Sequence, residues 1–178
     1  MPVRAAVWTL TVVSAAAVVW RHSSSPSRAV ALASAVVVLG VLSEIDIRTF
    51  LLPNKIVGPF AVATCVWVVA AGVIEGDVGR AGVSVGVGVG WALVLLLLSA
   101  RGHVGMGDVK LVVPVGMIAG WLGFEAVVIS VVVSLASSGL IGLVLLIGTR
   151  SKERESAVPY GPFLAVGSVA GMLLLAVG

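Results

Sequence analysis

The chain has 178 residues, of which 60% are hydrophobic and only 11% are charged. A soluble domain carries about 25% charged residues, so this composition excludes an ordinary soluble protein. The formal net charge is +3. The basic residues of the chain lie in short segments between hydrophobic runs, as expected of residues that set the orientation of a membrane protein rather than of residues that bind nucleic acid.

Seven hydrophobic segments predict an all-α, polytopic bundle of transmembrane helices with six to seven spans. About 20 apolar residues cross a hydrocarbon core of about 30 Å, and helices satisfy their own backbone hydrogen bonds there. A β-barrel needs alternating polar and apolar residues, and the run Trp91 to Leu98 does not alternate. We expect one integral-membrane domain, 1–178, with spans at about 5–20, 28–45, 56–74, 81–100, 109–122, 124–148 and 160–177.

The first segment, 5–20, has two interpretations. It is short and follows Arg4, which also fits the hydrophobic region of a signal peptide, with Ala15, Ala16 and Ala17 as small residues for cleavage. We expect an extra, retained N-terminal helix, because the rest of the chain forms a bundle that such a helix would join.

The stretch from Val109 to Thr149 is about twice the length of one span. It therefore predicts two helices, with a turn near Gly123 and Glu125. Pro114 lies inside the first of these helices and is a candidate kink.

Small residues recur at intervals of four along three of the predicted spans. This spacing places them on one face of a helix and lets two backbones approach closely, so it predicts helix packing. The residues are Gly82, Gly86 and Gly90, then Gly116 and Gly120, then Gly167 and Gly171.

Two aspartates stand at the ends of hydrophobic segments. A carboxylate near the bilayer centre costs roughly 2.5–3.5 kcal/mol on insertion scales, so its default interpretation is functional. Asp46 ends the second span, and Asp108 begins the fifth. Because two complete spans separate them, both aspartates should lie on the same side of the membrane.

The basic residues predict that this side is cytoplasmic. With a cytoplasmic N-terminus, the positive-inside rule is satisfied by 8 basic residues against 3. The 8 are Arg4, Arg48, Lys55, Arg101, Lys110, Arg150, Lys152 and Arg154, and the 3 are Arg21, Arg28 and Arg80.

Paired carboxylates suit hydrolysis of a peptide bond. One ionised carboxylate draws a proton from water, and a protonated partner polarises the scissile carbonyl. Two nearby carboxyl groups titrate as a unit, which favours this shared-proton state. Gly105 and Gly107 flank the loop before Asp108, and glycine lets an extended substrate approach the backbone closely.

Structural alternatives remain for both aspartates. Asp108 could cap the fifth helix, and Asp46 could be a solvated charge paired with Arg48. Glu44 lies off the Asp46 face of the helix and should meet solvent or a basic group. Lys110 should be an interfacial residue. A non-enzymatic alternative is a small transporter or assembly factor whose carboxylates bind protons or a cation.

Three blocks of sequence resemble those of type IV prepilin peptidases in order and spacing. They are IDIRTFLLPN at 45–54, GMGDVKL at 105–111 and PYGPFL at 159–164, and the resemblance covers about residues 28–178. Presenilin-like enzymes also carry Gly-x-Gly-Asp, but they place a tyrosine before the first aspartate and carry a Pro-Ala-Leu motif. Here Ile45 precedes Asp46, and no Pro-Ala-Leu occurs.

The resemblance implies a multi-pass plasma-membrane endopeptidase that cleaves the short basic leader of prepilin-like or preflagellin-like proteins at the cytoplasmic face. It implies Asp46 and Asp108 as the catalytic residues, and no metal or cofactor. The expected partners are these protein substrates and the lipid bilayer, without nucleic acid; the oligomeric state is not predicted. The residues of the substrate or loop motifs would be Gly105, Gly107, Lys110, Pro53 and Asn54.

One departure concerns a second activity. The larger bacterial enzymes carry a cytoplasmic insert with paired cysteines and also methylate the new N-terminus with S-adenosylmethionine. This chain has one cysteine, Cys65, and no such insert. The expectation is therefore peptidase activity only.

Overall fold

The computed structural model describes residues 2–100, 105–148 and 159–175. Within these residues the chain forms seven helices and no strand, which confirms the all-α prediction and all seven helical segments. The helices are α1 (Pro2–Arg21), α2 (Pro26–Thr49), α3 (Asn54–Ile74), α4 (Val78–Ser99), α5 (Met106–Leu122), α6 (Phe124–Gly148) and α7 (Gly161–Leu174).

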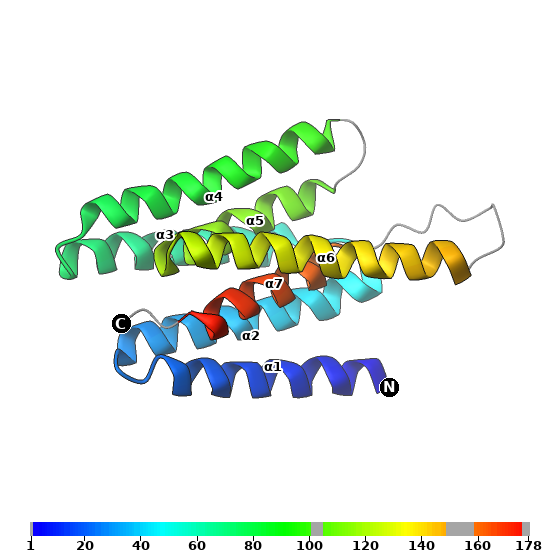
Figure 1. Cartoon of the computed structure of the whole chain (residues 1–178), viewed down its shortest axis with the longest axis horizontal. Coiled ribbons are helices and arrows are strands. Elements are labelled where there is room, and N and C mark those ends of the chain that lie inside the picture. The colour runs from blue at the N-terminus through cyan, green and yellow to red at the C-terminus, as the bar shows by residue number, and fades with distance from the viewer. Residues whose placement is uncertain (1, 101–104, 149–158, 176–178) are drawn as a thin grey trace.

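Successive helices run in opposite directions along the long axis of the bundle (Figure 1). As a result, the last turn of α2 and the first turns of α3, α5 and α7 lie at one end, on the right in Figure 1. We call this end of the bundle the dyad end, because Asp46 and Asp108 both lie there. The predicted placement of the two aspartates at one end is therefore confirmed.

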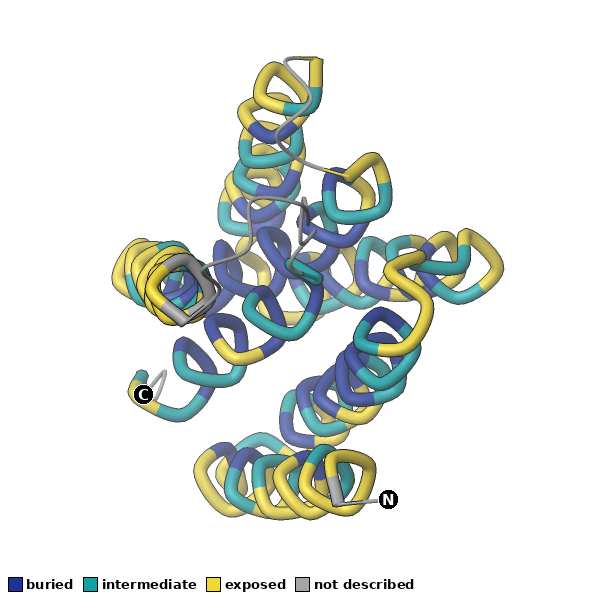
Figure 2. Tube along the Cα trace, turned by 90° about the vertical axis from the view of Figure 1, so that its right-hand side faces the viewer, coloured by how far each residue is buried: buried dark blue, intermediate teal, exposed yellow. Residues whose placement is uncertain are grey.

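In the described part of the chain, five helices are long and apolar enough to cross a membrane: α1, α2, α3, α4 and α6. Helices α5 and α7 are shorter, with 17 and 14 residues. Figure 2 shows buried positions facing the inside of the bundle and exposed positions facing outward. Many exposed side chains are large and apolar, such as Leu10, Val62 and Leu135. Such a surface suits contact with lipid rather than water, so the chain is a multi-pass membrane protein.

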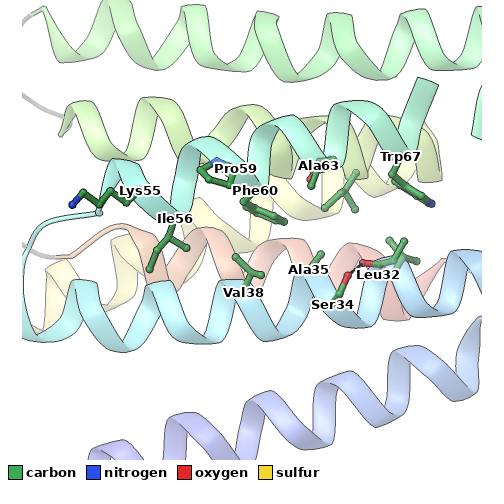
Figure 3. Close-up of a pocket in the computed structure, with 13 residues that line it drawn as sticks. Leu32, Ser34, Ala35, Val38, Lys55, Ile56, Pro59, Phe60, Ala63 and Trp67 are labelled. Atoms are coloured by element: carbon green, nitrogen blue, oxygen red, sulfur yellow. Dashed lines mark hydrogen bonds between the residues drawn. The ribbon is translucent and has the colours of Figure 1, made fainter. Parts of the chain in front are cut away.

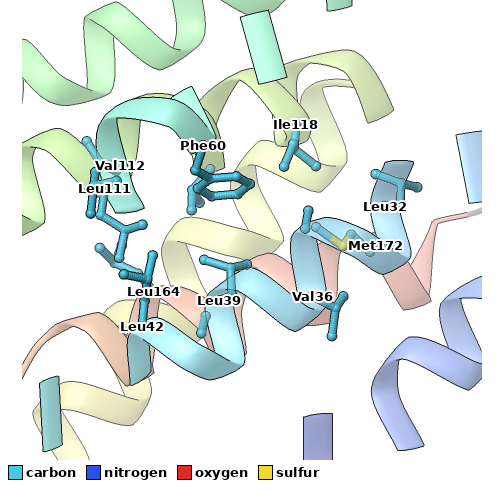
Figure 4. Packing of buried hydrophobic residues seen from close by; sticks show 14 of the residues in the cluster. Leu32, Val36, Leu39, Leu42, Phe60, Leu111, Val112, Ile118, Leu164 and Met172 are labelled. Atoms are coloured by element: carbon cyan, nitrogen blue, oxygen red, sulfur yellow. The ribbon is translucent and has the colours of Figure 1, made fainter. Parts of the chain in front are cut away.

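Helix α5 is the centre of the hydrophobic core. Leu111, Val112 and Ile118 of α5 meet residues of α2, α3 and α7 in one buried cluster (Figure 4). A second buried cluster joins Trp121 of α5 to α3 and α4. Helix α5 is thus packed on several sides, and its first turn lies at the dyad end.

The predicted turn after α5 is confirmed at Gly123. Its backbone φ of 121° is one that residues other than glycine rarely adopt. Pro114 is buried inside α5, and the helix continues through it to Leu122.

Close packing of α4 against α5 depends on small residues. A Cβ atom at Gly116 would lie 2.7 Å from the Cα of Gly88, and one at Gly120 would lie 2.8 Å from the Cα of Ser84. Packing at Gly116 and Gly120 was predicted correctly. The predicted packing stripe on α4 was wrong, because a Cβ atom at Gly82, Gly86 or Gly90 would have no neighbour within 4 Å.

The two predicted glycines of α7 do pack against another helix. Gly167 lies against Ser134 and the carbonyl of Ser130, and a Cβ atom at Gly171 would lie 2.6 Å from the hydroxyl of Ser130. These contacts hold α7 against α6.

Helix α1 packs along α2 and α7. Its Trp8 Nε1 donates a 2.6 Å hydrogen bond to Glu44, and Thr11 packs against Gly40. At the other end, Nε2 of His22 lies 2.9 Å from the carbonyl oxygen of Met172. Retention of this first helix, and the treatment of the chain as one domain, stay predictions.

Candidate active site

Asp46 lies in the last turn of α2 and is only 4% exposed. Its Oδ2 accepts a hydrogen bond of 3.0 Å from the backbone N–H of Gly161. The alternative interpretation, a solvated carboxylate paired with Arg48, was wrong. Arg48 instead forms an ion pair of 2.7 Å with Glu44, four residues before it on the same helix face.

Glu44 is occupied by a separate cluster of polar contacts. Besides Arg48, its carboxylate accepts the Trp8 hydrogen bond and pairs with Arg4 at 3.1 Å. The expectation that Glu44 meets basic groups is confirmed. Two residues along a helix point in different directions, so Glu44 and Asp46 face different neighbours.

Asp108 lies in the first turn of α5, just before the predicted span 109–122. The N-cap is Gly105 and the helix begins at Met106, which makes Asp108 the third helical residue. A hydrogen bond joins its carboxylate to the backbone of Gly105. A carboxylate at this position commonly reaches back to the N-cap N–H. The capping alternative is therefore correct in part: Asp108 supports the helix start from its third position rather than from the N-cap.

Asp46 is close enough to Asp108 to influence its protonation. Burial, followed by the negative charge of Asp46, raises the pKa of Asp108 to about 6, against the opposing effect of the Gly105 hydrogen bond. The structure thus brings together a carboxylate from α2 and one from α5. Such a pair holds one proton over a range of pH in which an ordinary aspartate would be ionised.

The start of α7 forms a third side of the site. Gly161 contacts Asp46 through its N–H. Burial, followed by the negative charge of Asp108, raises the pKa of Tyr160. The sequence did not predict a role for either residue. The available signal was the block at 159–164, which resembled a family motif without any chemistry attached to it.

The glycines before Asp108 allow close packing at the dyad end. A Cβ atom at Gly107 would lie 3.0 Å from the Cβ of Leu52, in the segment between α2 and α3. A Cβ atom at Gly105 would lie 3.2 Å from Oδ2 of Asp108. Both glycines therefore let α5 begin close to its neighbours.

The remaining motif residues lie at the same end but contact each other rather than the aspartates. Pro53 is the N-cap of α3, with a φ of −70°, and α3 starts at Asn54. The Lys110 ammonium donates a 3.0 Å hydrogen bond to Oδ1 of Asn54, and both side chains are exposed. This contact ties the start of α3 to the start of α5.

A separate apolar cavity of about 450 Å³ lies between α2 and α3. Figure 3 shows Leu32, Ala35 and Val38 of α2 facing α3 across this cavity, which extends from Lys55 to Trp67. Neither aspartate lines it. The cavity is therefore a lateral, apolar feature and not the place where the two carboxylates meet.

Among the residues that the structure describes, no group of three or more His, Cys, Asp or Glu side chains could hold a metal ion. The dyad end holds two carboxyl groups, the backbone N–H of Gly161 and the phenol of Tyr160.

The structure thus places two carboxyl groups at one end of a polytopic helix bundle. The chain belongs to the type IV leader peptidase family, whose model matches residues 33–147. Both aspartates lie inside the matched segment.

Three relatives illustrate the similarity, and each is named prepilin leader peptidase/N-methyltransferase. The protein of Pectobacterium carotovorum subsp. carotovorum is 30% identical over 136 residues, covering 75% of this chain and 47% of the relative. That of Escherichia coli (strain K12) is 30% identical over 137 residues, covering 76% and 59%. That of Burkholderia pseudomallei (strain K96243) is 32% identical over 134 residues, covering 72% and 41%.

The chain spans about half the length of the curated relatives it matches. No solved structure matches it.

Proposed function

We propose that this protein is a membrane aspartyl endopeptidase that removes the leader of type IV prepilin-like or preflagellin-like proteins. The observation that carries the proposal is that Asp46 and Asp108, which come from two helices inside the family-matched segment, lie at the same end of the bundle, where the charge of Asp46 acts on Asp108. The names of the relatives supply the substrate class.

The proposed reaction uses one proton shared by the two carboxyl groups. We assign this proton to Asp108, because burial and the negative charge of Asp46 both favour its neutral form. The ionised Asp46 takes a proton from a water molecule as the water oxygen adds to the scissile carbonyl carbon. Asp108 donates its proton to the carbonyl oxygen. The tetrahedral intermediate then collapses: Asp108 takes back the proton of one hydroxyl group as the C=O bond forms again, the C–N bond breaks, and the departing amine takes the proton held by Asp46.

We further propose that the dyad end faces the cytoplasm. Among the described residues, Arg4, Arg48, Lys55 and Lys110 belong to this end, and Arg21, Arg28 and Arg80 to the other. By the positive-inside rule, this distribution supports a cytoplasmic location for the dyad end and the N-terminus. The other basic residues of the sequence count lie outside the described residues: Arg101, Arg150, Lys152 and Arg154.

The proposal is restricted to leader cleavage. The relatives' names also include N-methyltransferase, whereas the only cysteine of this chain is Cys65, a half-buried residue of α3. Peptidase activity without methyl transfer is therefore the specific form of the proposal. The alternative of a transporter or assembly factor is disfavoured by the family match.

The test is to place the purified protein in lipid vesicles with a candidate prepilin from the same genome and to analyse the product by mass spectrometry. The proposal predicts loss of the leader and a product with an unmethylated N-terminus. If several candidate prepilins all remained intact, the peptidase function would be contradicted. A methylated product would contradict the restriction to cleavage.

A further inference from the structure

We propose that the backbone N–H of Gly161 positions the carboxylate of Asp46 for leader cleavage, and that residue 161 must be glycine for this reason. This inference rests on the proposed function. It makes α7, which carries neither aspartate, a third component of the active site.

The first support is the hydrogen bond itself. The N–H of Gly161 lies 3.0 Å from Oδ2 of Asp46, and this contact joins residues 115 positions apart in the sequence. Asp46 is 4% exposed, so little water competes for that oxygen. One oxygen of the carboxylate is therefore held, while Oδ1 has no protein donor among the described hydrogen bonds and is available to a water molecule.

The second support is the placement of the two helix ends. Asp46 lies in the last turn of α2, where the exposed carbonyl groups of the helix disfavour a negative charge. Gly161 is the first residue of α7, and its N–H is one of the free donors at a helix start. A helix start stabilises an anion, so α7 offsets the unfavourable end of α2.

The third support is the absence of space for a side chain at position 161. A Cβ atom there would lie 2.7 Å from Oδ2 of Asp46 and 3.3 Å from its Cγ. Ordinary contacts of a Cβ atom begin at 3.4 Å. Even alanine would therefore displace the carboxylate or the start of α7 by several tenths of an ångström. A misplacement of about 1 Å at a reacting group can cost about 100-fold in rate.

A purely structural role would also explain the hydrogen bond, because it ties α7 to α2. The two roles differ in what a substitution changes. Loss of positioning lowers kcat of a folded enzyme, whereas loss of a structural tie lowers the melting temperature and leaves kcat of the folded fraction unchanged.

The experiment compares Gly161→Ala with Gly82→Ala, whose new methyl group would have no neighbour within 4 Å. Prepilin cleavage and thermal unfolding are measured for both proteins in lipid. For Gly161→Ala we expect kcat to fall roughly 10- to 100-fold, with KM within about two-fold of the wild type. Gly82→Ala should match the wild type. A wild-type kcat in Gly161→Ala, or a rise in KM alone, would overturn the inference.

A second measurement applies even if Gly161→Ala does not fold. With glycine labelled by ¹⁵N, the amide proton of Gly161 is followed by NMR in the wild type and in Asp46→Ala. The inference predicts a clear shift of this signal when the carboxylate is removed, and an unchanged signal would overturn it. If the wild type cleaves no prepilin, the proposed function fails instead, while this NMR contact can still be measured.

Discussion

Burial, followed by the negative charge of Asp46 in the last turn of α2, raises the pKa of Asp108 in the first turn of α5. The two residues are 62 positions apart, with α3 and α4 between them. Because both residues lie at the dyad end, the bundle contains a pair of carboxyl groups that can hold one proton.

Leader cleavage should depend on pH through Asp108. Its pKa is raised to about 6, first by burial and then by Asp46. At pH 5 Asp108 holds its proton, and at pH 7.5 it is mostly ionised. The initial rate of cleavage should therefore fall as pH rises through about 6, measured at saturating prepilin in lipid vesicles. A rate that stays constant from pH 5 to pH 8 would show that this proton is not required.

The same group should make the stability of the protein depend on pH. The pKa of Asp108 is about 6 in the folded protein and 3.8 for the ordinary group. Between these values the folded state binds more protons than the unfolded state, so the free energy of unfolding decreases as pH rises from about 4 to about 6.

The substitution Asp108→Asn should remove the part of the pH dependence of stability that comes from Asp108. The melting temperature of the wild type should therefore decrease more than that of the variant between pH 4 and pH 7, as measured by thermal unfolding in detergent. Parallel curves for the two proteins would contradict the raised pKa.

Close packing of α4 and α5 should not tolerate a side chain at Gly116. A Cβ atom there would lie 2.7 Å from the Cα of Gly88. We expect Gly116→Ala to lower the free energy of unfolding by about 1–3 kcal/mol through overpacking. The matched control is Gly82→Ala, which should be neutral or stabilising by up to about 1 kcal/mol, because alanine is the better helix former. Equal stability of the two variants would show that α4 and α5 separate easily at Gly116.

The sequence predicted the helices and the common location of the aspartates because both depend on simple counts. Hydrophobic length identified each helical segment, and an even number of crossings between Asp46 and Asp108 placed them at one end. Neither count depends on which face of a helix meets its neighbour.

Helix rotation was harder to predict from the sequence. Spacing alone favoured Gly82, Gly86 and Gly90 as the packing face of α4, whereas the structure uses Ser84 and Gly88. Two stripes of small residues alternate along this helix, and only the position of α5 selects between them. The i to i+4 spacing of Glu44 and Arg48, by contrast, was a usable signal for their ion pair.

The contact between Gly161 and Asp46 was beyond sequence reasoning for a different reason. Almost every residue has a backbone N–H, so the residue type at position 161 does not reveal that this N–H binds a carboxylate. The two positions are also 115 residues apart. Only the packing of α7 against α2 brings them together.

The most direct test of the proposed function replaces each aspartate of the pair separately. Asp46→Asn and Asp108→Asn keep the size of the side chain but remove the carboxyl group. Glu44→Gln is the matched control, because Glu44 is a neighbouring carboxylate that pairs with Arg4 and Arg48 instead. All three variants and the wild type are incubated with prepilin in lipid, and leader removal is quantified by mass spectrometry. We expect the wild type and Glu44→Gln to cleave, and each aspartate variant to lose on the order of 1,000-fold or more in rate while remaining folded. Leader removal at the wild-type rate by either Asp46→Asn or Asp108→Asn would contradict catalysis by this carboxyl pair.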